Sequence, residues 1–161
     1  MEIRRVTPGE WRQLRDIRLA SLLDTPEAFG STYASTVSRP DEWFRDWAKR
    51  TAESPTDATF LAWDGDAAVG IVGTFNDKGE SVIVAMWVAP THRGDGLGRA
   101  LLDAVVGFIR AQGAAEVVLG VTDGNDAARA LYERYGFAFN GVANPLREGE
   151  PLIVRELRLK L

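Results

Sequence analysis

A glycine-rich loop offers the clearest binding chemistry in this 161-residue sequence. It follows an apolar, strand-like run that ends at Val88 and precedes a helix-like pattern that begins near Gly96. At such a junction, unpaired backbone N–H groups and the positive end of the helix dipole favour an anion such as phosphate, although the glycines alone would equally suit a tight turn. The residues that we predict to hold the anion are Arg93, Gly94, Asp95, Gly96, Leu97, Gly98 and Arg99.

Two common phosphate-binding motifs do not fit this loop. A Walker loop requires Gly-Lys-Ser/Thr, and none of the three lysines follows a glycine. A dinucleotide fingerprint of the form Gly-x-Gly-x-x-Gly/Ala fails in both registers, because Arg99 or Leu101 occupies the position of the last small residue. The sequence therefore indicates a different ligand that carries phosphate groups.

A second segment, residues 123–137, predicts a helix with a polar stripe. Asn125, Ala128 and Tyr132 are spaced at i, i+3 and i+7, so they share one face of that helix. Gly136 is placed to end the helix in a left-handed conformation, with Phe137 folding back as its apolar partner. Taken alone, Asn125 and Tyr132 are better explained as a helix cap and an ordinary half-buried aromatic side chain.

The two segments together resemble the signatures of the GNAT superfamily of N-acetyltransferases. Arg93-x-x-Gly96-x-Gly98 is similar to the first signature, and Asn125-x-x-Ala128-x-x-x-Tyr132-x-x-x-Gly-Phe is similar to the second. The resemblance covers about residues 59–139 and implies acetyl-CoA as co-substrate, with its diphosphate on the loop and no metal. Asp95 departs from the pattern, because many relatives carry a basic or polar residue there.

The resemblance also implies a role for individual residues. Tyr132 is expected to donate a proton to the departing thiolate of coenzyme A, and Asn125 and Ala128 are expected to lie against the pantetheine arm. The backbone of Met86, Trp87 and Val88 is expected to pair with pantetheine. The N–H of Val88 is then expected to polarise the acetyl carbonyl.

The acceptor and the base are less well defined by the sequence. An acceptor amine must lose a proton before it attacks, and we expect Glu80 or a chain of water molecules to accept that proton. His92 stands beside the diphosphate loop and is not expected to be catalytic. The predicted acceptor is a primary amine on a small molecule, lying near residues 26–38 and 140–151. A protein N-terminus, a lysine side chain or a non-catalytic acyl-CoA-binding module remain the alternatives.

The elements that must position these residues form a layered α+β pattern. Helices are predicted over residues 8–23, from Pro40, over 96–112 and over 125–135, with 28–38 irregular. Strands are predicted at the N-terminus, over 59–63, 67–75, 81–88 and 116–121, and twice after residue 137. We expect one domain over residues 1–161: a mixed, mostly antiparallel twisted sheet of about six to seven strands, with helices on both faces.

Composition narrows the class of protein further. Charged residues make up 26% of the chain with a net charge of −4 and no basic arm, which disfavours a nucleic-acid partner. The absence of cysteine excludes disulfides and thiolate catalysis within the sequence. No apolar run is long enough for a membrane span, so we expect a cytoplasmic protein without a membrane partner. A homodimer is possible, since homodimers are common in the superfamily that the sequence resembles.

Overall fold

The computed structural model describes all 161 residues and contains one seven-stranded sheet with the order β1-β2-β3-β4-β5-β7-β6. Every neighbouring pair of strands is antiparallel except β4 and β5, which run parallel. The predicted mixed, mostly antiparallel α+β sheet is therefore confirmed. The strands are β1 (Glu2–Arg5), β2 (Ala58–Asp64), β3 (Ala67–Asp77), β4 (Glu80–Val88), β5 (Glu116–Thr122), β6 (Ala138–Pro145) and β7 (Ile153–Lys160).

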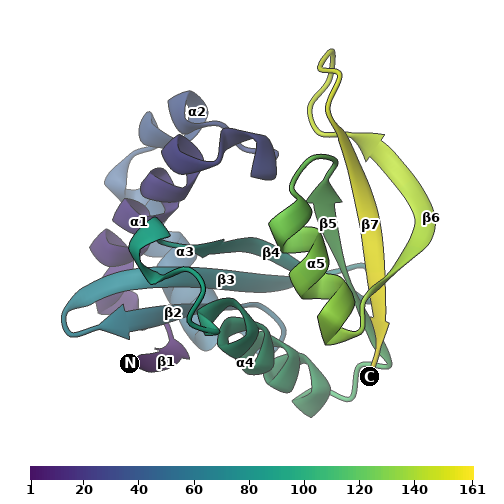
Figure 1. Cartoon of the computed structure of the whole chain (residues 1–161). Helices are drawn as coiled ribbons and strands as arrows, with labels where there is room; N and C mark the ends of the chain where they lie inside the picture. The colour runs from purple at the N-terminus through teal and green to yellow at the C-terminus, as the bar shows by residue number, and fades with distance from the viewer.

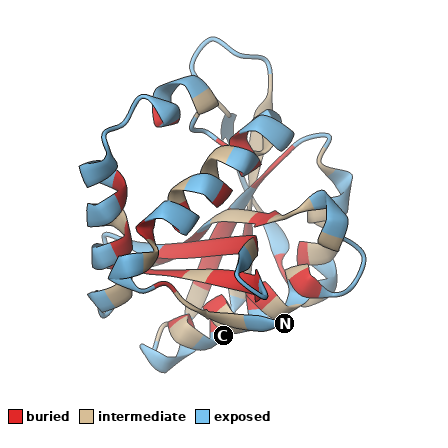
Figure 2. Cartoon of the chain, turned by 90° about the vertical axis from the view of Figure 1, so that its left-hand side faces the viewer, coloured by how far each residue is buried: buried red, intermediate tan, exposed pale blue.

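Helices cover both faces of the sheet, as predicted. The side chains of α1 and α3 form one apolar cluster with β2, β3 and Trp87, whereas α4 and α5 form a second, larger cluster on the opposite face. Figure 2 shows the buried residues on the central strands and on the inward sides of the helices. The α-helices are α1 (Trp11–Asp24), α2 (Tyr33–Val37), α3 (Asp41–Glu53), α4 (Leu97–Ala111) and α5 (Asp126–Tyr135), and the 3-10 turns are η1 (Pro8–Glu10), η2 (Pro26–Ala28) and η3 (Pro90–His92).

The parallel strands β4 and β5 separate after a short stretch of pairing. Only three residue pairs join them, from Ser81 opposite Val117 to Ile83 opposite Leu119. Beyond these pairs β4 stays paired with β3, and β5 stays paired with β7 as far as Thr122. In Figure 1 the strands β3 and β4 consequently run in a different direction from β5 and β7. The sheet therefore opens into a V between the carboxyl ends of β4 and β5.

A β-bulge in β4 lies where the V opens. Ile71 pairs with Trp87 and Gly73 pairs with Val84, so two residues of β4 oppose the single residue Val72. Ala85 has a φ of 58°, a left-handed conformation that is uncommon for a residue other than glycine. The extra residue shifts the alternation of side chains, so Ile83 joins the α4 face while Trp87 joins the α1 face.

The segment predicted to be irregular contains a short helix. Helix α2 begins after Thr32, whose hydroxyl oxygen accepts a hydrogen bond from the N–H of Ser35 at 3.1 Å. Sequence reasoning missed it because one and a half turns are too short for a periodic pattern. The end of α5 follows the prediction: Gly136 has a φ of 120°, and Phe137 packs back against Tyr132. No helix is both long enough and apolar enough to span a membrane.

Candidate active site

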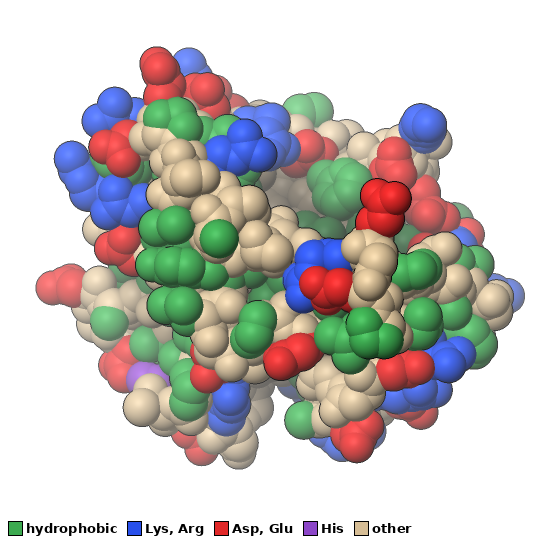
Figure 3. All heavy atoms as spheres, turned by 90° about the horizontal axis from the view of Figure 1, so that it is seen from above, with side chains coloured by type: hydrophobic (Ala, Val, Ile, Leu, Met, Phe, Trp, Pro, Cys, Tyr) green, Lys and Arg blue, Asp and Glu red, His purple; other side chains and the backbone are tan.

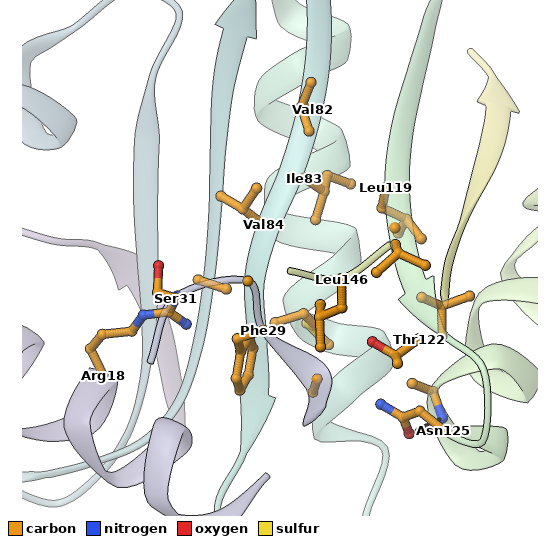
Figure 4. Close-up of a pocket in the computed structure, with 18 of the residues that line it drawn as sticks. Arg18, Phe29, Ser31, Val82, Ile83, Val84, Leu119, Thr122, Asn125 and Leu146 are labelled. Carbon is orange, nitrogen blue, oxygen red and sulfur yellow. Dashed lines mark hydrogen bonds between the residues drawn. The ribbon is translucent and has the colours of Figure 1, made fainter. Parts of the chain in front are cut away.

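The opening between β4 and β5 forms the main cleft of the molecule, with a volume of about 740 Å³. Figure 3 looks onto the end at which α2 and the β6–β7 loop lie, where the surface is hollowed. Figure 4 shows side chains from both strands and from the segment before α2 pointing into this space. The walls include Val82 to Met86 of β4, Leu119 to Thr122 of β5, Ala28 to Ser31, and Asn144 to Leu146.

The glycine-rich loop presents a row of free backbone donors at the start of α4. The amide N–H groups of residues 94 to 99 donate no hydrogen bond within the chain, and the intrahelical bonds begin only with the N–H of Ala100. Gly94 and Gly96 have φ values of 88° and 82°, which glycine adopts without strain. A Cβ atom at either position would meet no atom within 4 Å. The amides of the loop therefore have no partner within the chain, and the space beside its glycines is open.

The side chains of the loop do less for an anion than the sequence suggested. Arg93 donates to Asp24 at 2.5 Å and to the carbonyl of Val88 at 2.9 Å. The guanidinium of Arg99 stacks over the ring of Tyr135 at 5.1 Å. Both arginines are thus engaged within the protein, while Asp95 is exposed and forms no ion pair. The groups of this loop that have no partner within the protein are therefore mainly backbone amides.

Glycine is needed at position 98 for a different reason from that at positions 94 and 96. A Cβ atom on Gly98 would lie 2.9 Å from Cδ2 of Leu131 on α5 and 3.6 Å from Cε of Met86. Gly98 therefore permits α4 and α5 to pack closely. Because Met86 lines the cleft, the same contact joins the loop to the cleft. Leu97 is buried in the core of the α4 face.

Of the three β4 residues predicted to meet the pantetheine arm, only Met86 lines the cleft. Trp87 is buried on the α1 face, where its indole N–H donates to Asp24 at 3.0 Å. Val88 is paired with Gly70 of β3 and packs on the α4 face. The backbone that is free of regular pairing lies at the bulge, at Met86, which was among the predicted residues, and at Ala85, which sequence reasoning missed.

Helix α5 brings Asn125, Ala128 and Tyr132 to the cleft together, as their spacing predicted. Asn125 also caps the helix, because its side-chain oxygen accepts from the N–H of Ala128 at 3.4 Å. Burial raises the pKa of Tyr132 well above its usual value, and no hydrogen bond contributes to that shift. The phenol is therefore protonated at neutral pH and has a free O–H to donate.

The structure places Glu80 and His92 away from the cleft. Glu80 starts β4 at the closed end of the V and forms an ion pair with Arg158 at 3.2 Å. His92 lies between Thr91 and Asp64, at 2.8 Å from each partner. Neither residue is among those that line the cleft, so the predicted role of Glu80 as the base gains no support from its position.

The walls opposite α5 come from segments far apart in the sequence, and they include parts of residues 26–38 and 140–151, the two regions predicted to lie near the acceptor. Phe29, Trp43 and Trp47 line the cleft, whereas Tyr33 does not. Two hydrogen bonds hold the segment before α2 across the opening. The hydroxyl of Thr122 on β5 donates to the carbonyl of Glu27 at 2.7 Å, and Arg147 donates to the carbonyl of Phe29 at 2.8 Å. The two sides of the V are therefore connected at its mouth.

Comparison with known proteins identifies the family to which the chain belongs. The sequence profile described as the acetyltransferase (GNAT) family matches residues 12–137, which is most of the chain. The chain belongs to this family of acetyltransferases. A solved structure of yncA from Salmonella typhimurium, with its cofactor acetyl-CoA, has the same fold with a TM-score of 0.82 and 20% identity, over 100% of this chain and 94% of that one.

Two curated acetyltransferases are similar over part of their length. A mycothiol acetyltransferase from Geodermatophilus obscurus is 40% identical over 52% of this chain, which covers 29% of that protein. A streptothricin acetyltransferase from Streptomyces lavendulae is 36% identical over 60% of this chain and 53% of its own length. This chain thus spans at most about half the length of these two relatives.

Proposed function

We propose that this GNAT domain transfers the acetyl group of acetyl-CoA to a primary amine on a small molecule. The observation that carries the proposal is the row of unpaired amides at the start of α4, joined through Met86 to a cleft between two diverging strands. Such a row suits the diphosphate of coenzyme A, and the cleft suits its pantetheine arm. The solved relative that contains acetyl-CoA and the two small-molecule acetyltransferases add support.

The chain offers two groups for the chemistry of acyl transfer. The irregular backbone at Ala85 and Met86 faces the cleft, where an N–H group would stabilise the negative charge that develops on the acetyl oxygen. The hydroxyl of Tyr132 is protonated and free, so it would donate a proton to the thiolate that leaves. Acetyl-CoA itself supplies the activated acyl group.

The acceptor amine must reach the thioester from the side opposite α5. No carboxylate and no histidine line the cleft, so we infer that water, rather than a side chain, accepts the proton of the attacking ammonium group. The hydrogen bonds from Thr122 and Arg147 hold the α2 segment across the mouth of the cleft. That closure favours a small acceptor over an extended polypeptide.

The proposal is tested by following free thiol when the protein is mixed with acetyl-CoA and a panel of small amines, peptides with free N-termini and lysine peptides. We expect thiol release that depends on a small amine, with the acetylated amine identified by mass spectrometry. Release only with peptides would favour a protein acceptor. Tight binding of acetyl-CoA, measured by calorimetry, without release in any mixture would support a non-catalytic binding module instead.

A further inference from the structure

One cationic side chain enters the cleft without any partner. Arg18, on α1, is the only charged residue among the 24 that line the cleft. Its guanidinium donates no hydrogen bond and forms no ion pair within the chain, and its Nη1 atom is both buried and unsatisfied. Its one favourable contact is with the ring of Phe29, whose centroid lies 4.7 Å from Cζ. In Figure 4 the side chain extends from α1 toward Phe29 and β4.

This arrangement is unfavourable for the protein by itself. Burial lowers the pKa of Arg18 to about 10, and no neighbouring charge or hydrogen bond opposes the shift. The other desolvated arginine, Arg5, shows how the fold normally treats such a group. Arg5 also lies over a phenylalanine ring, but it donates to the carbonyls of Thr51, Ser54 and Asp57. Arg18 has donors of the same kind and no acceptor, so a ligand would have to provide one.

The surroundings of Arg18 indicate what that ligand group is. A guanidinium presents a planar fork of N–H donors that matches the two oxygens of a carboxylate. In Figure 4 Ser31 lies beside Arg18, and no acidic side chain lines the cleft to compete for the arginine. A phosphate would carry more charge than a single guanidinium balances. A carboxylate is therefore the better match.

The position of Arg18 separates it from the cofactor. In Figure 4 it lies on the opposite side of the drawn residues from Thr122 and Asn125, which mark the α5 wall. The free amides that suit the diphosphate lie at the start of α4, on the other face of the sheet from α1. An anion beside Arg18 therefore belongs to the second substrate.

We propose that the acceptor is an amine of about the size of an amino acid that also bears a carboxylate, and that Arg18 binds this carboxylate. The proposal rests on the acetyl-transfer function proposed above and narrows its substrate class. Arg18 acts by fixing the acceptor in the cleft, with its amine turned toward the thioester. It does not take part in proton transfer.

Product binding tests the proposal without requiring turnover. The protein, saturated with coenzyme A, is titrated with N-acetyl derivatives of the common amino acids and with their carboxamides, and binding is measured by calorimetry. The two members of each pair differ only in the carboxylate. We expect at least one acid to bind about tenfold or more tightly than its amide, as a charged hydrogen-bonded pair predicts. We expect Arg18→Met to remove this preference. Arg12→Met, an exposed arginine on the same helix stacked on Trp11, should keep it.

Two results would overturn the proposal: no acid in the panel binds better than its amide, or the preference survives in Arg18→Met. The turnover assay separates this failure from that of the proposed function. Thiol release with amines that lack a carboxylate, at the same kcat/KM as with their carboxylated analogues, would keep the acetyltransferase and remove the role of Arg18. Selective binding of N-acetyl acids without any thiol release would keep the carboxylate site and remove the catalytic function.

Discussion

Replacing Arg18 with methionine should make the unliganded protein more stable. The guanidinium is charged in both the folded and the unfolded chain below pH 10, so at neutral pH its desolvation in the fold is uncompensated. The fall of its pKa to about 10 corresponds to about 3 kcal/mol of destabilisation. That cost disappears only as the pH rises above the folded pKa toward the higher pKa of the unfolded chain. Methionine retains an apolar stem of similar length without the charge.

The net gain is smaller than the full cost of desolvation. The stacking of Arg18 on Phe29 is lost in the variant, and such contacts contribute about 1 kcal/mol. Relaxation and water in the cleft reduce the remainder further. We therefore expect Arg18→Met to raise the free energy of unfolding by about 1–2 kcal/mol, which for a domain of this size raises the Tm by roughly 2–4 °C per kcal/mol.

Arg5→Met is the matched comparison. Arg5 lies 4.8 Å over the ring of Phe108, and burial lowers its pKa too, but its guanidinium donates to the carbonyl of Thr51 at 2.8 Å and to that of Asp57 at 3.0 Å. Its removal leaves these carbonyls without their charged donor. We expect a loss of about 3 kcal/mol from the broken bonds. The same substitution should thus change stability in opposite directions at the two sites.

Urea and thermal unfolding of the wild type and both variants, without ligand, measure the two changes. A loss of stability in Arg18→Met comparable to that in Arg5→Met would refute the reasoning, because it would mean that Arg18 stabilises the fold. The gain is expected to come with weaker acceptor binding, since binding residues held without partners commonly lower stability.

Four further changes test other parts of the site. Gly96→Glu should abolish the binding of coenzyme A, measured by calorimetry. Gly79→Glu is the control, because Gly79 also has a positive φ, of 94°, and equally open space. Both variants should lose about 1–2 kcal/mol of stability to backbone strain, but Gly79→Glu should still bind coenzyme A. Tyr132→Phe should keep cofactor affinity and slow thiol release by roughly a hundredfold; full activity would assign the hydroxyl no role in catalysis. Gly98→Val should destabilise the domain by about 2 kcal/mol, and a stable variant that loses only the cofactor would contradict its packing role. Thr122→Val should raise the acceptor KM and leave acetyl-CoA binding unchanged, measured by steady-state kinetics.

Two parts of the site could be predicted from the sequence, one from its glycines and the other from helical periodicity. The loop requires positive φ at Gly94 and Gly96, and only glycine adopts that conformation readily. The face that α5 turns to the cleft followed from the i, i+3, i+7 spacing of Asn125 and Tyr132. Ala85 carries no such mark, because an alanine in a left-handed bulge looks like any other strand residue. The order of β5, β7 and β6 depends on non-local pairing, which periodicity does not encode.

The spacing of Arg18 along α1 indicates that it lies near the buried side of the helix, which the sequence analysis did not use. Trp11, Leu14 and Ile17 define the buried side of α1, and Arg18 follows Leu14 by four residues and Trp11 by seven. An arginine at core spacing on an amphipathic helix either snorkels to the surface or enters a cavity. The sequence cannot distinguish these outcomes, because the cavity is created by β4 and by the segment before α2, which are distant in the chain.

Two of the charged side chains predicted to act at the site form ion pairs within the protein. Arg93 joins the glycine loop to Asp24 at the end of α1, and Glu80 pairs with Arg158 at the closed end of the V. The sequence does not reveal these ion pairs, because an arginine or a glutamate near a site pairs with whichever opposite charge the fold brings closest. Backbone donors have no such freedom, since the helix start fixes where they point.

The cleft exists because β4 and β5 stop pairing with each other, while β4 stays paired with β3 and β5 stays paired with β7. On β5, Gly120 allows this, since a Cβ atom there would lie 2.7 Å from Cγ1 of Val154 on β7. On β4, the bulge at Ala85 turns the strand and leaves one residue outside the ladder. A larger residue at Gly120 would push β7 away from β5 and move the wall that carries Thr122. The shape of the site thus depends on two small residues, Gly120 and Ala85, and the unpartnered Arg18 facing this gap is the feature most able to select the acceptor.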